Sequence, residues 1–246
     1  MSNMNNYEEV KANFALETPE LYNFGFDVID KRADESDKLA YIEVDGAGEN
    51  ITHHKFSDLR DISNQFANGL LSLGAEKGEL AFVMIPRISE WYAIMIGCCK
   101  LGVVTMPGTN LLTSKDIEYR INRSKATMAI VTSENADKVD AIKSKCPTLE
   151  KLIVIGDERN GWNTFEQLIK NSNKRLDKSQ LAPSKASDLM MIYFTSGTTG
   201  MPKMVARDNA YAHAHTITGE YWMDLQENDI HWTLSDTGWA KAAWGM

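Results

Sequence analysis

Residues 80–107 read LAFVMIPRISEWYAIMIGCCKLGVVTMP, and their pattern indicates how the chain folds. Leu80–Ile85 is a continuous apolar run that ends at a proline, which is typical of a strand buried on both faces of a parallel sheet. Ser89–Leu101 has the length of a helix, and Gly102 after it can end a helix in the left-handed conformation. Val103–Met106 is then a second apolar run. The order strand, helix, strand predicts a right-handed crossover between two parallel strands.

The same alternation continues toward the N-terminus. Ser57–Leu73 is predicted to be a helix, because its leucine, isoleucine and phenylalanine side chains recur at spacings of three and four and share one face. Gly74 can end that helix. Leu39–Val44 is a strand candidate, and the turn residues that follow it from Asp45 to Gly48 predict a hairpin with a second short strand.

Toward the C-terminus, Thr113 followed by Asp116 fits a capping box at the start of a helix. Further apolar runs at Ala126–Val131 and Leu152–Ile155 predict two more strands. The predicted fold class is therefore α/β, with layered, mostly parallel sheets flanked by helices.

The domain organisation follows from composition. Residues 1–35 are acidic and mixed, with helical spacing at Val10, Phe14, Leu21 and Phe24, and are expected to form an N-terminal arm. Residues 36–246 are expected to form one partial large domain. Asn171–Asp188 is polar and is interpreted as a connecting loop within that domain.

Composition narrows the class of protein. The chain has 246 residues, 43% hydrophobic and 24% charged, which is ordinary for a soluble globular domain. Its formal net charge of -8 disfavours a duplex nucleic-acid binder or a polybasic membrane-surface protein.

No run approaches the ~18 apolar residues of a membrane span, and Met1–Glu9 lacks the apolar segment of a signal peptide. These features predict a cytoplasmic protein. The three cysteines and five histidines show no metal-ligand spacing, so no metal site is predicted.

One segment carries chemistry. The apolar run Met190–Phe194 leads directly into Thr195–Lys203, whose sequence is TSGTTGMPK. Glycines allow a backbone to approach a phosphate and to direct successive N–H groups at it, while hydroxyls add donors and the lysine adds a positive charge. The glycine spacing does not fit the P-loop of the NTPases that carry a Gly-Lys-Ser/Thr motif. The alternative for such a turn is an ordinary polar surface loop.

Residues 193–203, YFTSGTTGMPK, resemble the phosphate-binding signature of the adenylate-forming, or AMP-binding, superfamily. Three further segments are similar to the medium-chain acyl-CoA synthetases of that superfamily: PRISEW at 86–91, MPGT at 106–109, and Trp232 together with SDTGWAK at 235–241. The resemblance covers nearly the whole chain and implies the N-terminal part of the large domain of such an enzyme.

The resemblance implies an ATP-dependent ligase of fatty acid metabolism. A carboxylate attacks the α-phosphorus of ATP to give an acyl-adenylate and pyrophosphate, and CoA then displaces AMP to give a thioester. The residues implied in binding the ATP phosphates are Thr195, Ser196, Gly197, Thr198, Thr199, Gly200, Met201, Pro202 and Lys203, with Mg²⁺ sharing the charge. Trp239 matches a position that lines the acyl pocket in the superfamily. The alternative is that Trp239 is a core tryptophan. Asp236 is either an orienting residue or a helix cap.

Several expected motifs of the superfamily do not occur among these residues: a Tyr-Gly-x-Thr-Glu segment, a Thr-Gly-Asp segment and the catalytic lysine of a C-terminal lobe. No catalytic residue is therefore assigned within residues 1–246, the lysine is expected beyond Met246, and the chain alone is expected to be inactive. Two alternatives stay open, a non-catalytic nucleotide-binding or interaction module and a peptide-synthetase-type adenylation domain. Neither the carboxylic acid nor the oligomeric state follows from the sequence.

Overall fold

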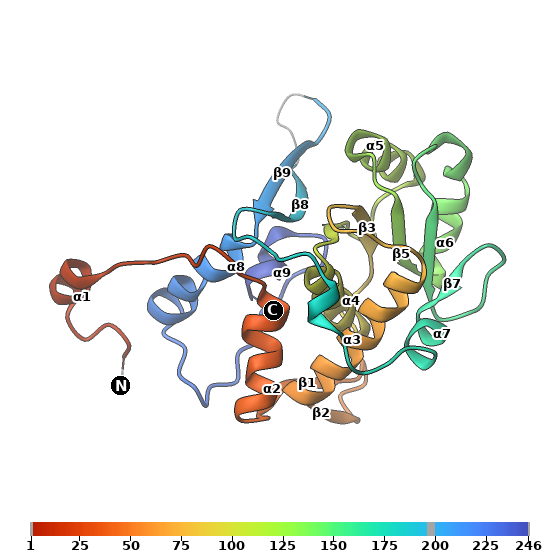
Figure 1. Ribbon diagram of the computed structural model, residues 1–246. Coiled ribbons are helices and arrows are strands. Elements are labelled where there is room, and N and C mark those ends of the chain that lie inside the picture. The colour runs from red at the N-terminus through yellow and green to blue at the C-terminus, as the bar shows by residue number, and fades with distance from the viewer. Residues whose placement is uncertain (1, 196–199, 246) are drawn as a thin grey trace.

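A seven-stranded sheet forms the centre of the computed structural model, which describes residues 2–195 and 200–245 (Figure 1). The strands lie in the order β7-β6-β5-β3-β4-β8-β9. Their bounds are β3 Leu80–Met84, β4 Val104–Pro107, β5 Met128–Thr132, β6 Lys151–Ile155, β7 Asn163–Thr164, β8 Leu189–Thr195 and β9 Lys203–Asp208. Neighbouring strands pair in parallel except β8 and β9, which form an antiparallel hairpin at one edge. The predicted, mostly parallel sheet is confirmed.

Strand β9 was not predicted, and its burial explains why. Its residues are exposed or only half-buried, as expected for the outermost strand of a sheet. An edge strand of this kind does not need the continuous apolar run by which the central strands were recognised. Asp208 is the last residue of β9, and helix α8, Ala210–Ala214, begins two residues later.

Helices cover both faces of the sheet, and strand β3 shows how the sequence directs them. Ala81 and Val83 belong to one buried cluster together with residues of α3, α4 and α7. Phe82 and Met84 point to the other face and pack against residues of α5 and α6. Alternate residues of a strand therefore contribute to separate cores, as expected for a sheet buried on both sides. The helix bounds are α3 Phe56–Ser72, α4 Ser89–Leu101, α5 Ser114–Ser124, α6 Ser133–Asp140 and α7 Phe165–Lys170.

The predicted helix signals are present in the structure. Thr113 is the N-cap of α5 and accepts from the backbone N–H of Asp116, whose carboxylate accepts from the backbone N–H of Thr113 in return. Gly74 and Gly102 follow α3 and α4 with positive φ angles of 71° and 70°. The predicted hairpin is also present, formed by β1 Leu39–Val44 and β2 Ile51–Lys55.

The other helical elements are short. They are α1 Tyr7–Asn13, the π-helical turn η1 Gly25–Asp30, α2 Lys31–Glu35, η2 Lys143–Lys145, η3 Lys178–Gln180, α8, the π-helical turn η4 Thr218–Trp222, and α9 Ala240–Gly245. The helical spacing predicted for the N-terminal segment holds only in part, because α1 ends at Asn13 and residues 14–23 belong to no helix. Figure 1 shows α1 projecting from the main body, next to the segment that contains α8. The boundary of an N-terminal arm at residue 35 stays a prediction.

A buried ion pair fixes the end of that N-terminal segment to the helices. Lys100 of α4 lies 2.6 Å from Asp30 of η1, and its side chain is fully buried. The Lys100 ammonium also donates to Ser63 Oγ at 2.9 Å and to Asn64 Oδ1 at 2.7 Å, both in α3. Burial lowers the pKa of Lys100 and raises that of Asp30, while their mutual attraction opposes both shifts. Three segments distant in sequence therefore meet at one ammonium group.

Candidate functional site

Three neighbouring parallel strands end at the same edge of the sheet. Strands β3, β4 and β8 lie side by side, and their carboxyl ends lead into the PRISEW segment, the MPGT segment and the TSGTTGMPK segment respectively. In open α/β sheets this edge is where ligands bind, because the loops that follow parallel strands gather there. The topology thus brings together three of the four segments that the sequence analysis singled out.

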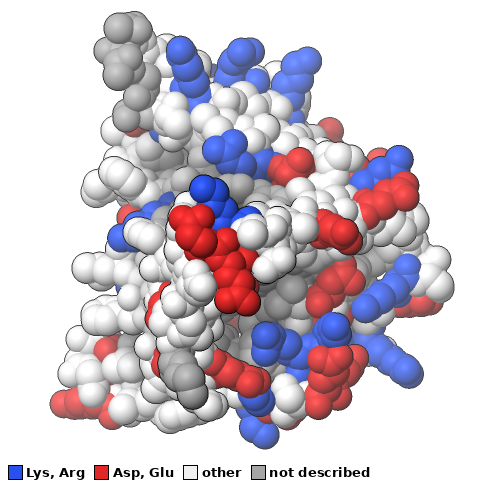
Figure 2. Space-filling model, turned by 90° about the vertical axis from the view of Figure 1, so that its left-hand side faces the viewer, with Lys and Arg blue, Asp and Glu red and all other residues white. Residues whose placement is uncertain are grey.

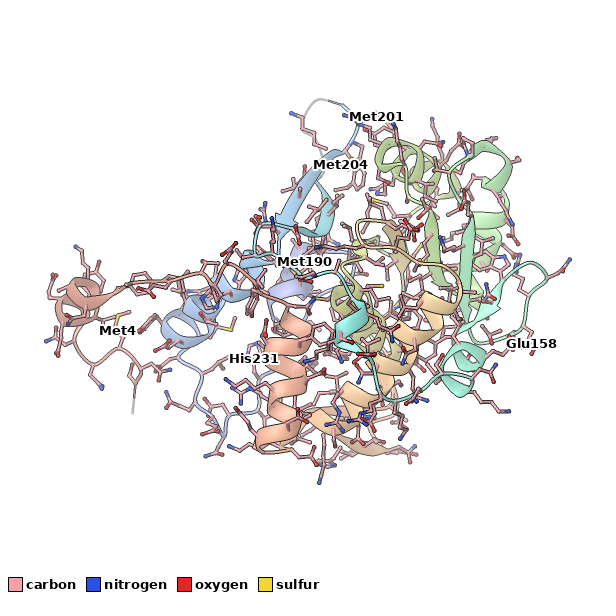
Figure 3. All side chains as sticks on the ribbon, in the orientation of Figure 1. Met4, Glu158, Met190, Met201, Met204 and His231 are labelled. Atoms are coloured by element: carbon pink, nitrogen blue, oxygen red, sulfur yellow. The ribbon has the colours of Figure 1, made fainter. Side chains whose placement is uncertain are left out.

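The glycine-rich segment connects the two strands of the edge hairpin. Thr195 pairs with Lys203 at the base of this connection. Gly200 and Met201 are exposed and Pro202 is half-buried. Figure 3 shows Met201 and Met204 at the outer end of the hairpin, well away from Met190 at its inner end. Ser196, Gly197, Thr198 and Thr199 lie outside the described residues.

Helix α5 contacts both stems of this connection. The hydroxyl of Tyr119 donates to the backbone carbonyl of Pro202 at 3.0 Å. The Tyr119 ring lies edge-on to Phe194, with centroids 6.1 Å apart. The guanidinium of Arg120 lies 5.1 Å from the centroid of the same Phe194 ring. Partial burial lowers the pKa of Arg120, although the Asp116 carboxylate opposes this shift. Sequence reasoning missed both residues, because a tyrosine and an arginine on a helix carry no spacing signal.

The SDTGWAK segment packs on the loops that follow β3 and β4. The buried hydroxyl of Thr237 donates to the backbone carbonyl of Ile85 at 2.5 Å. Gly238 lies so close to the MPGT segment that a Cβ atom there would be 2.1 Å from the backbone nitrogen of Thr109. Asp236 accepts from the backbone N–H of Gly238 at 2.8 Å. Of the two roles considered for Asp236, the structure therefore shows a local one: its carboxylate holds the turn just before α9.

Trp239 follows this tight contact and is 65% exposed. It is not a core tryptophan in this chain. Trp232 and Leu234, from the same stretch, are 78% and 68% exposed. The turn that contacts the loop after β4 therefore presents a large apolar side chain at the surface. The role of Trp239 in an acyl pocket stays a prediction.

Basic side chains gather at one end of the face that Figure 2 shows. Figure 2 shows Lys and Arg side chains along the upper end of the molecule, the end at which Figure 1 places the β8–β9 connection and α5.

Within residues 2–195 and 200–245, no cluster of three or more His, Cys, Asp or Glu side chains is arranged to hold a metal ion. The histidines form separate contacts instead, such as His54 with Glu43 at 3.0 Å and His213 with the carbonyl of Glu17 at 3.0 Å. Within the described ranges, every helix is too short or too polar to span a lipid bilayer.

Comparison with known proteins gives consistent results. The family model described as AMP-binding enzyme matches residues 29–246. The mitochondrial acyl-coenzyme A synthetase ACSM3 of Mus musculus is 38% identical over 98% of this chain and 43% of its own length. The mitochondrial acyl-coenzyme A synthetase ACSM5 of Homo sapiens is 37% identical over 93% of this chain and 40% of its own length. The chain thus spans less than half the length of these curated relatives.

Two solved structures share the fold. The acyl-CoA synthetase of Brucella canis superposes with a TM-score of 0.85 at 22% identity, covering 98% of this chain and 45% of that one. An anthranilate CoA ligase in complex with anthranoyl-AMP superposes with a TM-score of 0.71 at 24% identity, covering 83% of this chain and 38% of that one.

The comparisons also correct one prediction. We predicted a cytoplasmic location from the polar N-terminus, but the relatives from mouse, rat and human are named as mitochondrial proteins, which contradicts it. The polar composition of Met1–Glu9 was therefore a poor guide to compartment. The fold prediction and the family prediction are both confirmed, and the chain belongs to the AMP-binding enzyme family.

Proposed function

We propose that residues 1–246 form the phosphate-binding and acyl-binding part of an ATP-dependent acyl-CoA synthetase. The observation that carries this proposal is the meeting of three loops at the carboxyl edge of β3, β4 and β8, one of them rich in glycine and hydroxyl side chains. Relatives that are 37–38% identical over almost the whole chain are acyl-coenzyme A synthetases, which supports the same activity.

The phosphate-binding part is Thr195–Lys203. In acyl-adenylate formation, negative charge concentrates on the phosphates as pyrophosphate leaves, so preorganised donors and cations aimed there lower the barrier. Lys203 is exposed at the first position of β9, directly beyond the glycine-rich connection. Its ammonium is the cation that we assign to the phosphates, and the threonine and serine hydroxyls of the connection are the additional donors.

The acyl-binding part is the turn that carries Trp239. The exposed indole beside the loop after β4 offers an apolar surface to an alkyl or aromatic group. The close contact of Gly238 with Thr109 fixes where that indole stands relative to the sheet edge. The length of the acid depends on the rest of the pocket, because one methylene changes binding by only about 1–3 kcal/mol.

ATP, Mg²⁺ and CoA are the co-substrates and metal of the proposed reaction. The described residues supply no carboxylate or histidine cluster that would hold Mg²⁺ by themselves. The ion would therefore arrive with the nucleotide, since Mg²⁺ in phosphoryl-transfer sites is bound largely by substrate phosphates and water. We assign no step and no protein ligand to it within this chain.

The two other functions considered receive less support. A peptide-synthetase-type adenylation domain would share the glycine-rich segment. The relatives above are acyl-coenzyme A synthetases, and 98% of this chain aligns with the mouse protein. A non-catalytic nucleotide-binding module would be consistent with phosphate binding by these residues. It would differ in showing no ligase activity in the polypeptide that the native gene encodes.

Phosphate binding by the chain itself tests the proposal. Titration calorimetry with MgATP and with inorganic tripolyphosphate should show binding, and Lys203→Ala should weaken it. Lys170→Ala is a matched control, because Lys170 ends α7 on a different part of the molecule. Failure of the wild-type chain to bind either ligand would contradict the phosphate-binding assignment. The chain alone should show no carboxylate-dependent ATP–pyrophosphate exchange, because residues 1–246 lack the three further motifs of the superfamily.

A further inference from the structure

We infer that Tyr119 of helix α5 is a positioning residue for the phosphate-binding connection, with Arg120 as its partner at the other stem. The inference rests on the proposed function, because it concerns how that same site is held. It is argued from the two described stems, Phe194–Thr195 and Pro202–Lys203, and from the helix that contacts both.

The exit stem is held by a hydrogen bond. The Tyr119 hydroxyl donates to the carbonyl of Pro202, the residue directly before Lys203, at 3.0 Å. The carbonyl of Pro202 belongs to the same peptide plane as the backbone nitrogen of Lys203. Fixing this carbonyl therefore fixes the orientation of the peptide from which the Lys203 side chain departs. Both Tyr119 and Pro202 are half-buried, so water competes for this bond less than it does at the surface.

The entrance stem is held by aromatic contacts. Phe194 directly precedes Thr195, and its ring meets the Tyr119 ring edge-on at 6.1 Å and the Arg120 guanidinium at 5.1 Å. Aromatic edge contacts and cation–π contacts both favour one ring position over others. The two adjacent residues of α5 thus hold the two sides of the hairpin connection.

Helix α5 is itself well fixed, which is what a positioning element requires. Ile117 and Ile121 are fully buried in the core between α5 and the sheet. Thr113 and Asp116 form a reciprocal capping box at its start. Tyr119 therefore projects from a rigid helix onto a connection at the edge of the sheet. Rigid support of this kind holds the two stems, and with them the base of the Lys203 side chain, in place before a ligand binds.

Amide hydrogen exchange in the ligand-free chain tests this role. Tyr119→Phe removes only the hydroxyl and keeps the ring on Phe194. Loss of one half-buried hydrogen bond should raise exchange in peptides covering residues 200–205 by about two- to tenfold. The exchange rates of the β3 and β5 amides should not change, because the Tyr119 hydroxyl does not contact these strands. Arg120→Gln should raise exchange around residues 194–195 instead. Tyr7→Phe, an exposed tyrosine in α1, is the matched control and should leave both regions unchanged.

The outcomes separate this inference from the proposed function. If Tyr119→Phe leaves exchange at residues 200–205 at the wild-type rate, the positioning role is wrong, whatever the chain binds. If exchange rises there alone and tripolyphosphate affinity falls in the same variant, the positioning role is supported. If exchange rises and wild-type tripolyphosphate binding is absent, Tyr119 still holds the connection and the phosphate-binding assignment is the part overturned. A uniform rise across the whole sheet would indicate general destabilisation and would also overturn the inference.

Discussion

Replacing Gly238 with alanine is the sharpest perturbation of the acyl-binding turn. A Cβ atom at this position would lie 2.1 Å from the backbone nitrogen of Thr109 and 2.4 Å from the carbonyl carbon of Gly108. Both partners are backbone atoms and cannot rotate away. The φ angle of Gly238 is not in the positive region, so the requirement for glycine here is one of space.

The size of the effect follows from that geometry. The turn and the loop after β4 would have to separate by more than about 1 Å to reach ordinary van der Waals contact. Overpacking of this kind typically costs about 1–3 kcal/mol. For a chain of this length, each kcal/mol lowers the melting temperature by about 2–4 °C, so we expect a decrease of roughly 2–12 °C.

The melting temperature can be measured by scanning calorimetry, with Gly219→Ala as the matched control. Gly219 lies in the same C-terminal region, and its nearest neighbour would be an ordinary 3.9 Å from the new Cβ. Limited trypsin digestion gives a local readout, because the exposed Lys241 follows the turn and should be cut faster in Gly238→Ala. Equal melting temperatures and equal cleavage rates for the two variants would refute the close-contact reasoning.

Four other perturbations have expected outcomes. Asp30→Asn should lower the free energy of unfolding, measured in urea, by about 3–5 kcal/mol, because it leaves the Lys100 ammonium buried without its charge partner. The double variant Asp30→Leu with Lys100→Met should recover most of this loss. In Lys100→Met alone, Asp30 keeps the burial that raises its pKa and loses the ammonium that lowers it, so the free energy of unfolding should fall as pH rises from acid to neutral; a rise would contradict this. Thr113→Ala should cost about 1 kcal/mol through loss of the α5 cap, and an unchanged urea midpoint would show that the cap contributes nothing. Trp239→Ala should raise the KM for the carboxylic acid in the polypeptide encoded by the native gene while leaving tripolyphosphate affinity of the chain unchanged, and a change in the latter alone would place Trp239 outside the acyl pocket.

The central strands and helices could be predicted because each satisfies one strong physical requirement. Strands buried on both faces must be apolar throughout, as Leu80–Met84 is, and an amphipathic helix must repeat its apolar residues, as Phe56–Ser72 does. The place of the glycine-rich segment directly after an apolar strand could also be predicted, and the pairing of Thr195 with Lys203 shows it. Its role in phosphate binding stays a prediction.

Other features could not be predicted because they depend on tertiary contacts. Strand β9 lies at the sheet edge and lacks an apolar run. The bond from Tyr119 to Pro202 joins residues 83 positions apart, and no local pattern announces it. The need for glycine at position 238 arises from a loop more than a hundred residues earlier in the chain.

The activity of the polypeptide that the native gene encodes would show whether this chain is part of an acyl-CoA synthetase. The gene should be sequenced past codon 246, and its product should be assayed with ATP, Mg²⁺, CoA and a panel of short, medium-chain and aromatic carboxylic acids. We predict loss of CoA thiol with formation of equal amounts of AMP for at least one acid, and loss of this activity in Lys203→Ala. No formation of AMP with any acid in a folded product that binds ATP would contradict the assignment as an acyl-CoA synthetase.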